Sequence, residues 1–89
     1  MTTFHRAEIL TGSTDQEPAD LLALALADFD TTQVIEGFDA SAFTKTGQVR
    51  IWVKFWAASE AEARAAAKRA ARALRVPADV LFVHTIKGA

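Results

Sequence analysis

The stretch QVRIWVKFW, residues 48–56, decides how this chain folds. Its odd-numbered positions are all apolar: Val49, Ile51, Val53 and Phe55. After Gln48, its even-numbered positions are charged or aromatic: Arg50, Trp52, Lys54 and Trp56. Successive side chains of a β-strand point to opposite faces of the sheet. The pattern therefore predicts a strand over residues 48–57 with one face buried in a core and the other face open.

A β-hairpin joins this strand to the residues before it. Residues 32–43 form the preceding strand, and Thr44-Lys45-Thr46-Gly47 form a four-residue loop in which glycine suits a positive φ. We predict the register that places four residues opposite Phe55, Val53, Ile51 and Val49, in that order: Glu36, Phe38, Ala40 and Ala42. A slip by one residue would bring Asp39 to the buried face, where an unpaired carboxylate is costly.

Two helices flank the hairpin. The later one is predicted over residues 59–75, because Ser59 and Glu62 form a capping box and Pro77 stops it. Its apolar face contains Ala63, Ala66, Ala67, Ala70 and Leu74. The earlier helix begins between residues 15 and 19, since Thr14 with Glu17 resembles a capping box whereas Pro18 suits a first helical turn. Its apolar face contains Leu21, Leu22, Ala25, Leu26 and Phe29.

Strands over residues 4–10 and 80–86 complete the order β-α-β-β-α-β. This order predicts one α+β domain over residues 1–89 with the ferredoxin-like βαββαβ plait, a four-stranded antiparallel sheet in the order 4-1-3-2. Both helices would cover one face of the sheet and leave the other face open. The plait carries many unrelated functions, so the fold alone names none.

Composition excludes several classes of protein. The chain is 51% hydrophobic, which excludes a disordered protein. It has no cysteine, which excludes disulfides, thiolate metal sites and cysteine nucleophiles. We see no signal-peptide pattern and no apolar run long enough to span a bilayer, so we expect a cytoplasmic protein without a membrane role. Abundant alanine and arginine, with no asparagine, indicate a GC-rich genome. An accessory or phage-encoded protein of a high-GC bacterium would fit.

The sequence offers few residues for catalysis. His5 and His84 lie on strands predicted to be neighbours, and aligned registers would bring them together as a pair for metal binding or proton transfer. No third ligand accompanies them, and the alternative is two ordinary strand residues. We find no carboxylate pair, no Ser/His/Asp arrangement and no glycine-rich phosphate loop. We therefore expect no enzyme, no metal and no cofactor.

The open face of the sheet is the best candidate contact surface. It would contain Arg50, Trp52, Lys54 and Trp56, with Arg6 and Phe4 alongside. The face could dock a protein, either a second copy or another chain. It could also stack its tryptophans on the bases of single-stranded nucleic acid, or hold them only in cross-strand pairs. We favour a protein partner, because Asp39 and Glu8 share this face and the isoelectric point is near 6.1.

Charge is distributed unevenly along the chain. Residues 1–40 contain eight acidic and one basic side chain, whereas residues 41–89 contain nine basic and three acidic. Part of the basic excess forms a stripe on the later helix: Arg64, Lys68, Arg72 and Arg75. This stripe would meet acidic protein or phosphate, or it is simply the solvated face of an amphipathic helix. We favour the solvated face.

These observations predict a small non-enzymatic interaction protein. It would bind a protein partner, itself or another chain, through the open face of its sheet. Single-stranded nucleic-acid binding through the same strand is the alternative.

Overall fold

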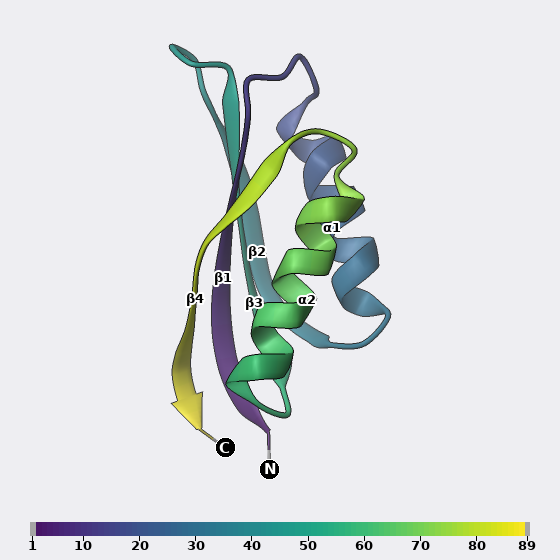
Figure 1. The fold of residues 1–89 in the computed structure, drawn as a ribbon, viewed down its shortest axis with the longest axis vertical. Helices are drawn as coiled ribbons and strands as arrows, with labels where there is room; N and C mark the ends of the chain where they lie inside the picture. The colour runs from purple at the N-terminus through teal and green to yellow at the C-terminus, as the bar shows by residue number, and fades with distance from the viewer. Residues whose placement is uncertain (1, 89) are drawn as a thin grey trace.

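The computed structural model describes residues 2–88. Four strands and two helices follow one another in the predicted order β-α-β-β-α-β (Figure 1). The strands are β1 (Thr3–Thr11), β2 (Val34–Phe43), β3 (Gln48–Ala57) and β4 (Ala78–Gly88). The helices are α1 (Pro18–Asp30) and α2 (Glu60–Ala73). The last strand extends beyond the predicted residues 80–86 at both ends, because it pairs with the whole of β1.

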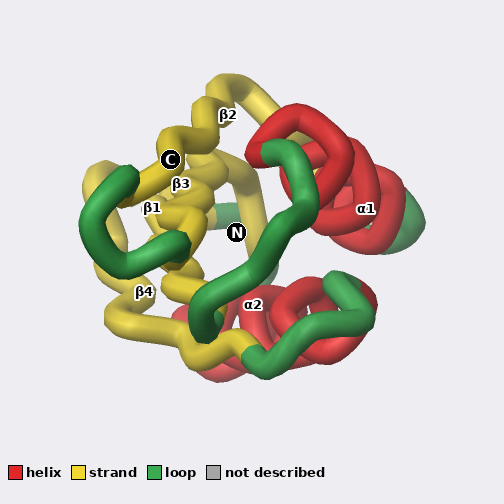
Figure 2. The backbone as a smooth tube through the Cα atoms, turned by 90° about the horizontal axis from the view of Figure 1, so that it is seen from above, coloured by secondary structure: helices red, strands yellow, loops and turns green. Residues whose placement is uncertain are grey.

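The four strands form one antiparallel sheet in the order β2-β3-β1-β4. Both helices lie on the same side of this sheet, and the other side is open (Figures 1 and 2). Helix α1 packs mainly on β2, whereas α2 packs mainly on β4 and β1. The predicted ferredoxin-like plait and its strand order are confirmed.

The hairpin confirms most of the predicted register and corrects one position. Ala42, Ala40 and Phe38 lie opposite Val49, Ile51 and Val53, and Gly47 closes the loop at a φ of 73°. A β-bulge after Ile35 then places Ile35, and not Glu36, opposite Phe55. The extra residue lets an apolar side chain pack against the core and leaves the Glu36 carboxylate exposed.

The two helices begin in different ways. The Ser59 hydroxyl accepts a hydrogen bond from the Glu62 N–H at 3.1 Å, as predicted for the cap of α2. Of the two starts that the sequence left open for α1, the structure has the one with proline in the first turn: Glu17 occupies the cap without a side-chain hydrogen bond, and Pro18 takes the first helical position. Thr14 instead accepts a hydrogen bond from the Gln16 N–H in the preceding loop.

The core lies between the helices and the covered face of the sheet. Four residues of β3 are at most 1% exposed: Val49, Ile51, Val53 and Phe55. The Phe29 ring of α1 packs on Phe55, with ring centroids 4.8 Å apart. Four alanines of α2 and its C-cap residue are equally buried, as predicted: Ala63, Ala66, Ala67, Ala70 and Leu74. Phe38 remains 51% exposed, since it lies on the edge strand β2.

Neither helix in residues 2–88 is long and apolar enough to cross a membrane.

Candidate functional site

The open face brings together the six residues predicted as a contact surface. Antiparallel pairing of β1 with β3 sets four pairs side by side: Phe4–Trp56, Arg6–Lys54, Glu8–Trp52 and Leu10–Arg50. Directly opposed side chains of neighbouring strands lie within contact distance of one another. The six residues therefore form one continuous surface, defined by the alternation along β3 and the strand order.

Trp52 lies at the centre of this face between two cations. Its ring is 4.9 Å from the Arg6 guanidinium and 5.6 Å from the Lys54 ammonium, both within the range of cation–π attraction. A methyl group on Gly37 would lie 3.7 Å from the indole, so the ring covers this glycine as well. Trp52 is thus half-buried by neighbours on the sheet and not fully exposed.

Trp56 is also half-buried, and its polar end is satisfied within the chain. Its ring packs against Phe4 with centroids 4.9 Å apart. The indole N–H donates a hydrogen bond to Glu36 Oε1 at 3.2 Å, which the bulge in β2 makes possible. The cross-strand pairing weighed from the sequence is therefore present, and it leaves part of each tryptophan in solvent.

A nearly buried carboxylate lies beneath the cations. The Glu8 side chain is 9% exposed, and Oε1 is 3.5 Å from Arg6 Nη2 and 3.8 Å from Arg50 Nε. Arg6 Nε is buried without a hydrogen-bond partner among the described residues. The Glu8 carboxylate thus partly neutralises the positive charge of Arg6 and Arg50, while the Arg6 Nε–H makes no hydrogen bond within the described residues.

Two further strands contribute residues that the sequence analysis did not include in the site. Phe82 and His84 of β4 lie opposite Glu8 and Arg6, with their rings 4.8 Å apart. On the other side, the Arg50 guanidinium is 5.6 Å from the Phe43 ring of β2. Residues 80–83 are all apolar, so the sequence does not indicate which side chains of this strand face outward, and two register shifts between β1 and β4 add to the ambiguity.

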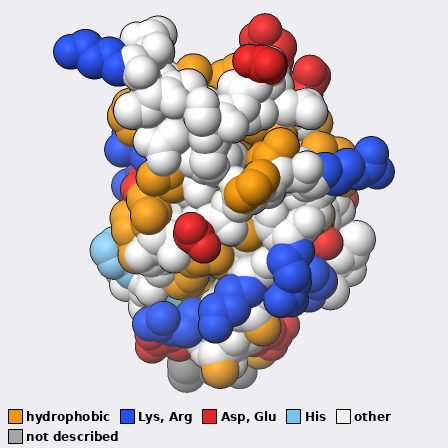
Figure 3. Space-filling model, turned by 45° about the horizontal axis from the view of Figure 1, so that its top comes forward, with side chains coloured by type: hydrophobic (Ala, Val, Ile, Leu, Met, Phe, Trp, Pro, Cys, Tyr) orange, Lys and Arg blue, Asp and Glu red, His pale blue; other side chains and the backbone are white. Residues whose placement is uncertain are grey.

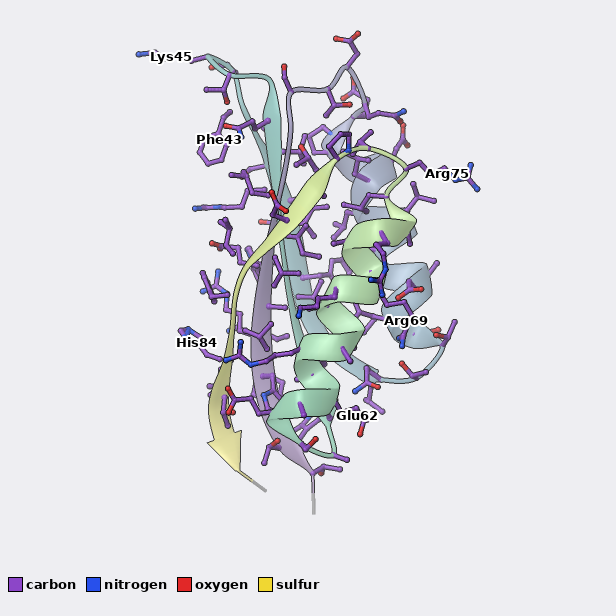
Figure 4. The ribbon with its side chains drawn as sticks, in the orientation of Figure 1. Phe43, Lys45, Glu62, Arg69, Arg75 and His84 are labelled. Atoms are coloured by element: carbon purple, nitrogen blue, oxygen red, sulfur yellow. The ribbon has the colours of Figure 1, made fainter. Side chains whose placement is uncertain are left out.

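His5 and His84 do not meet. His5 lies opposite Thr85 on the covered face, whereas His84 lies opposite Arg6 and points away from the helices (Figure 4). The His5 ring is fully buried and hydrogen-bonds with Thr3 Oγ1 and Thr85 Oγ1. Burial lowers the pKa of His5, and the nearby Glu60 carboxylate opposes this shift. No group of three potential metal ligands occurs in the described part of the chain.

The basic stripe of α2 lies away from the open face, on the helix layer. Arg64, Lys68, Arg72 and Arg75 are all exposed, and Arg64 pairs with Glu60 at 2.8 Å. Arg69 beside them turns toward α1, where it binds Asp28 at 3.0 Å and the Thr32 hydroxyl (Figure 4). Figure 3 shows a band of basic side chains with acidic side chains beside it, and a further acidic group at the far end of the molecule.

A shallow hollow of about 600 Å³ lies at the hairpin end of the open face. Leu10, Ala42, Phe43 and Gln48 line it, together with residues 44–46 of the loop. Phe43 points away from the helices here and is 42% exposed (Figure 4). The hollow extends the apolar part of the face beyond the tryptophans.

Comparisons with known proteins identify the fold and no family. No protein-family model matches the chain, and no curated protein matches it. An uncharacterized protein from Thermotoga maritima is similar in structure, with a TM-score of 0.63 and 10% sequence identity over 98% of this chain and 100% of that one.

Two larger proteins contain a similar unit. An unknown protein from Galdieria sulphuraria matches all of this chain with a TM-score of 0.60 and 9% identity, over 48% of its own length. A dinuclear metal binding peptidase of the M20 family from Bacillus subtilis matches with a TM-score of 0.54 and 11% identity, over 28% of its own length. Identities this low support the fold alone.

Proposed function

We propose that this chain is a non-enzymatic interaction protein that binds a protein partner through the open face of its sheet. The observation that carries the proposal is the surroundings of Trp52. Its ring lies between Arg6 and Lys54 on the face of the sheet that the helices do not cover. Both tryptophans of this face are only half-buried. Trp and Arg are the side chains that most often dominate the energy of protein interfaces.

The charges of the face favour protein over nucleic acid. Phosphate binding depends on cations that are free to neutralise a backbone. Two of the three central cations, Arg6 and Arg50, already lie close to the Glu8 carboxylate. Asp39 and Glu36 are exposed on the neighbouring strand β2 and would repel phosphate. A face with both signs of charge around aromatic rings suits a protein surface of mixed charge.

Affinity capture with paired variants tests the proposal. Immobilised wild type is compared with Trp52→Ala/Trp56→Ala, and any captured protein is identified, purified and measured again for direct binding. The matched control is Lys68→Ala/Arg72→Ala, which removes exposed side chains of α2 on the opposite layer. We expect the control to bind like wild type and the tryptophan variant to lose binding, with its circular dichroism unchanged. Equal binding by all three proteins would contradict the proposal.

A titration with single-stranded oligonucleotides tests the alternative. Stacking of a base on Trp52 or Trp56 would quench tryptophan fluorescence, and the effect would weaken steeply with salt. Under the proposal we expect no salt-dependent quenching. Saturable quenching at low salt that is lost in Trp52→Ala would instead establish a nucleic-acid binder.

A further inference from the structure

Strand β2 is one edge of the sheet and carries exposed apolar side chains. Among residues 2–88, three of the five large apolar side chains that are exposed lie on this strand: Val34, Phe38 and Phe43. The other two, Leu81 and Ile86, lie on the opposite edge β4, at the register shifts where they have no paired residue on β1. Bulges, lysine and proline are the usual means of preventing edge-to-edge pairing. Residues 37–43 of β2 contain none of them.

The free backbone groups of this segment belong to its even-numbered residues. The Val49 N–H donates to Thr11 Oγ1 on the β1 side at 2.9 Å, so it points away from β2, and Val49 is not hydrogen-bonded to Ala42 opposite it. Bonded and non-bonded pairs alternate along an antiparallel ladder. The backbone groups that point outward therefore belong to Phe38, Ala40 and Ala42. The Ala40 N–H agrees with this, because it donates to Asp39 Oδ1 at 2.8 Å and not to β3.

The unbulged segment 37–43 is centred on Ala40, a residue whose backbone groups point outward. A second copy laid antiparallel along this edge, with Ala40 opposite Ala40, pairs the whole segment with itself. Ala40 with Ala40, and twice Phe38 with Ala42, are then pairs that exchange two main-chain hydrogen bonds each. Such bonds supply the affinity when a strand is added to a sheet edge.

From this symmetry we infer that β2 pairs with β2 of a second copy, so that the two sheets join into one about a two-fold axis between the Ala40 residues. A two-fold interface uses the same patch twice, so the patch must be complementary to itself. This interface lies at the edge of the sheet and is separate from the open face, so the inference goes beyond the proposed function. The axis is perpendicular to the sheet and keeps both helix layers on the same side.

The side chains of the segment are complementary in this register. On the covered face, the half-exposed Phe38 ring lies opposite the small Ala42 of the second copy. On the open face, Phe43 lies opposite Gly37, which has no side chain of its own. In the same row Asp39 lies opposite Ser41, whose hydroxyl is a donor for the carboxylate. Large side chains thus meet small ones, and no charge meets its like.

The two neighbouring registers fit less well. An axis at residue 39 places Asp39 opposite Asp39, and like charges directly opposite destabilise a strand pair. It also brings the bulge after Ile35 into the pairing. An axis at residue 41 pairs only residues 39–43 and leaves Gly37 opposite Lys45 of the loop. The register centred on Ala40 is the one that uses the whole segment.

Helix α1 adds an apolar flank to this edge. Asp28 faces α2, since its carboxylate binds Arg69 at 3.0 Å. Leu26 and Leu22 precede Asp28 by two and six residues, which at about 100° per residue places them on the opposite flank, toward the edge of the sheet. Both are only partly buried. The two-fold axis brings this flank toward the same flank of the second copy.

The expected dimer is weak and reversible. Seven residues at about 3.4 Å and two layers of about 10 Å each give a contact of at most about 500 Å² per copy. The total of about 1,000 Å² is near the lower limit for specific interfaces. Pairing also moves the Ala40 N–H from Asp39 to the second copy, so one hydrogen bond is exchanged for another.

Disulfide formation between introduced cysteines tests the inference and its register. The chain has no cysteine, so no other thiol competes. Asp39→Cys and Ser41→Cys are oxidised separately and as an equimolar mixture, with the exposed Lys68→Cys of α2 as the control. Across the axis, the Cα atoms of residues 39 and 41 would lie about 4.5 Å apart, within disulfide range. Each residue would lie about 8 Å from its own equivalent, which is too far.

We expect the mixed disulfide to dominate the mixture and to form at least about fivefold faster than the Lys68→Cys disulfide. Faster formation of either homodisulfide would overturn the register centred on Ala40. Formation of no product faster than that of Lys68→Cys would overturn the edge pairing itself.

Sedimentation velocity separates this interface from the open face. Ala40→Pro removes an N–H that β3 does not use and puts the proline ring in the path of a second strand, a change that edge strands tolerate. We expect it to weaken the dimer at least about tenfold with unchanged circular dichroism, whereas Trp52→Ala/Trp56→Ala should dimerise like wild type. If Ala40→Pro does not fold, the cysteine variants decide.

A wild type that stays monomeric at its highest soluble concentration would overturn the inference, and so would a dimer unaffected by Ala40→Pro. A dimer lost only in Trp52→Ala/Trp56→Ala would place the second copy on the open face, which removes the edge dimer and supports the proposed function. Loss of the captured partner in the tryptophan variant but not in Ala40→Pro keeps the proposed function whatever the oligomeric state.

Discussion

The two faces of the sheet share the same strands and differ in where their contacts come from. On β3, Phe55 is buried completely by residues of its own chain, whereas its neighbour Trp56 is only half-buried. The covered face is closed by α1 and α2, which bury the apolar side chains of β3. The open face is partly closed by cation–π pairs, one indole hydrogen bond and a central carboxylate. The difference shows that the odd positions of one strand form the core, whereas its even positions leave aromatic and charged side chains partly exposed.

Alanine substitution of adjacent residues on β3 should give the largest contrast. Phe55→Ala removes a fully buried ring that contacts Phe29, and we expect a loss of about 3–5 kcal/mol in the free energy of unfolding. Trp56→Ala removes a half-buried ring and should cost about 1 kcal/mol. Urea denaturation of both variants measures the contrast. Equal losses would show that the open face contributes to stability as much as the core does.

The pH dependence of stability tests the covered face, because His5 is buried there. Burial lowers the pKa of His5 in the folded state below its ordinary value of 6.5. The unfolded chain therefore takes up a proton first, and unfolding is favoured as the pH falls from 6.5 through the lower folded pKa. We expect the midpoint of thermal unfolding to fall over this range in wild type. His5→Gln should flatten the dependence. An unchanged slope in His5→Gln would contradict this account.

The covered face was predictable from the sequence because its signals agree. The alternation along residues 48–56, the glycine at position 47 and the alanines of α2 all require the same sheet and the same helix layer. The bulge at Glu36 was not predictable, because alternation cannot show where one extra residue enters a strand. The start of α1 was ambiguous, since Thr14 and Pro18 gave competing signals and only the proline is used as predicted.

The open face was predictable only where it follows β3 and β1. Strand order alone brings Arg6 and Phe4 beside Lys54 and Trp56. The contribution of β4 depends on its register against β1, and two register shifts change that register along the pair. For the same reason the sequence could not decide whether His5 and His84 meet. Contacts between strands distant in the chain are set by packing of the complete sheet, which no local pattern records.

Removal of the central carboxylate should have a small effect on stability. In Glu8→Gln the two arginines lose an ion-pair partner, but both partners are more than a third exposed and the separations are 3.5 and 3.8 Å. We expect a loss of at most about 1 kcal/mol, and less at high salt. Urea denaturation at low and high salt measures the loss of stability and its dependence on salt. A loss above about 2 kcal/mol would mean that Glu8 acts as a buried ion pair and that the open face is more closed than its exposure indicates.

The smallest effect is expected where Trp52 covers β2. In Gly37→Ala the new methyl group would meet Trp52 Cζ3 at 3.7 Å, an ordinary contact distance, and the backbone needs no positive φ. We expect a change within about 0.5 kcal/mol, since added contact and a less flexible unfolded chain oppose any local adjustment. Gly47→Ala is the matched control, because its φ is 73° and its methyl group would lie 2.6 Å from Ser13 Oγ. A large loss in Gly37→Ala would show that Trp52 is packed as tightly as the core residues on the other face.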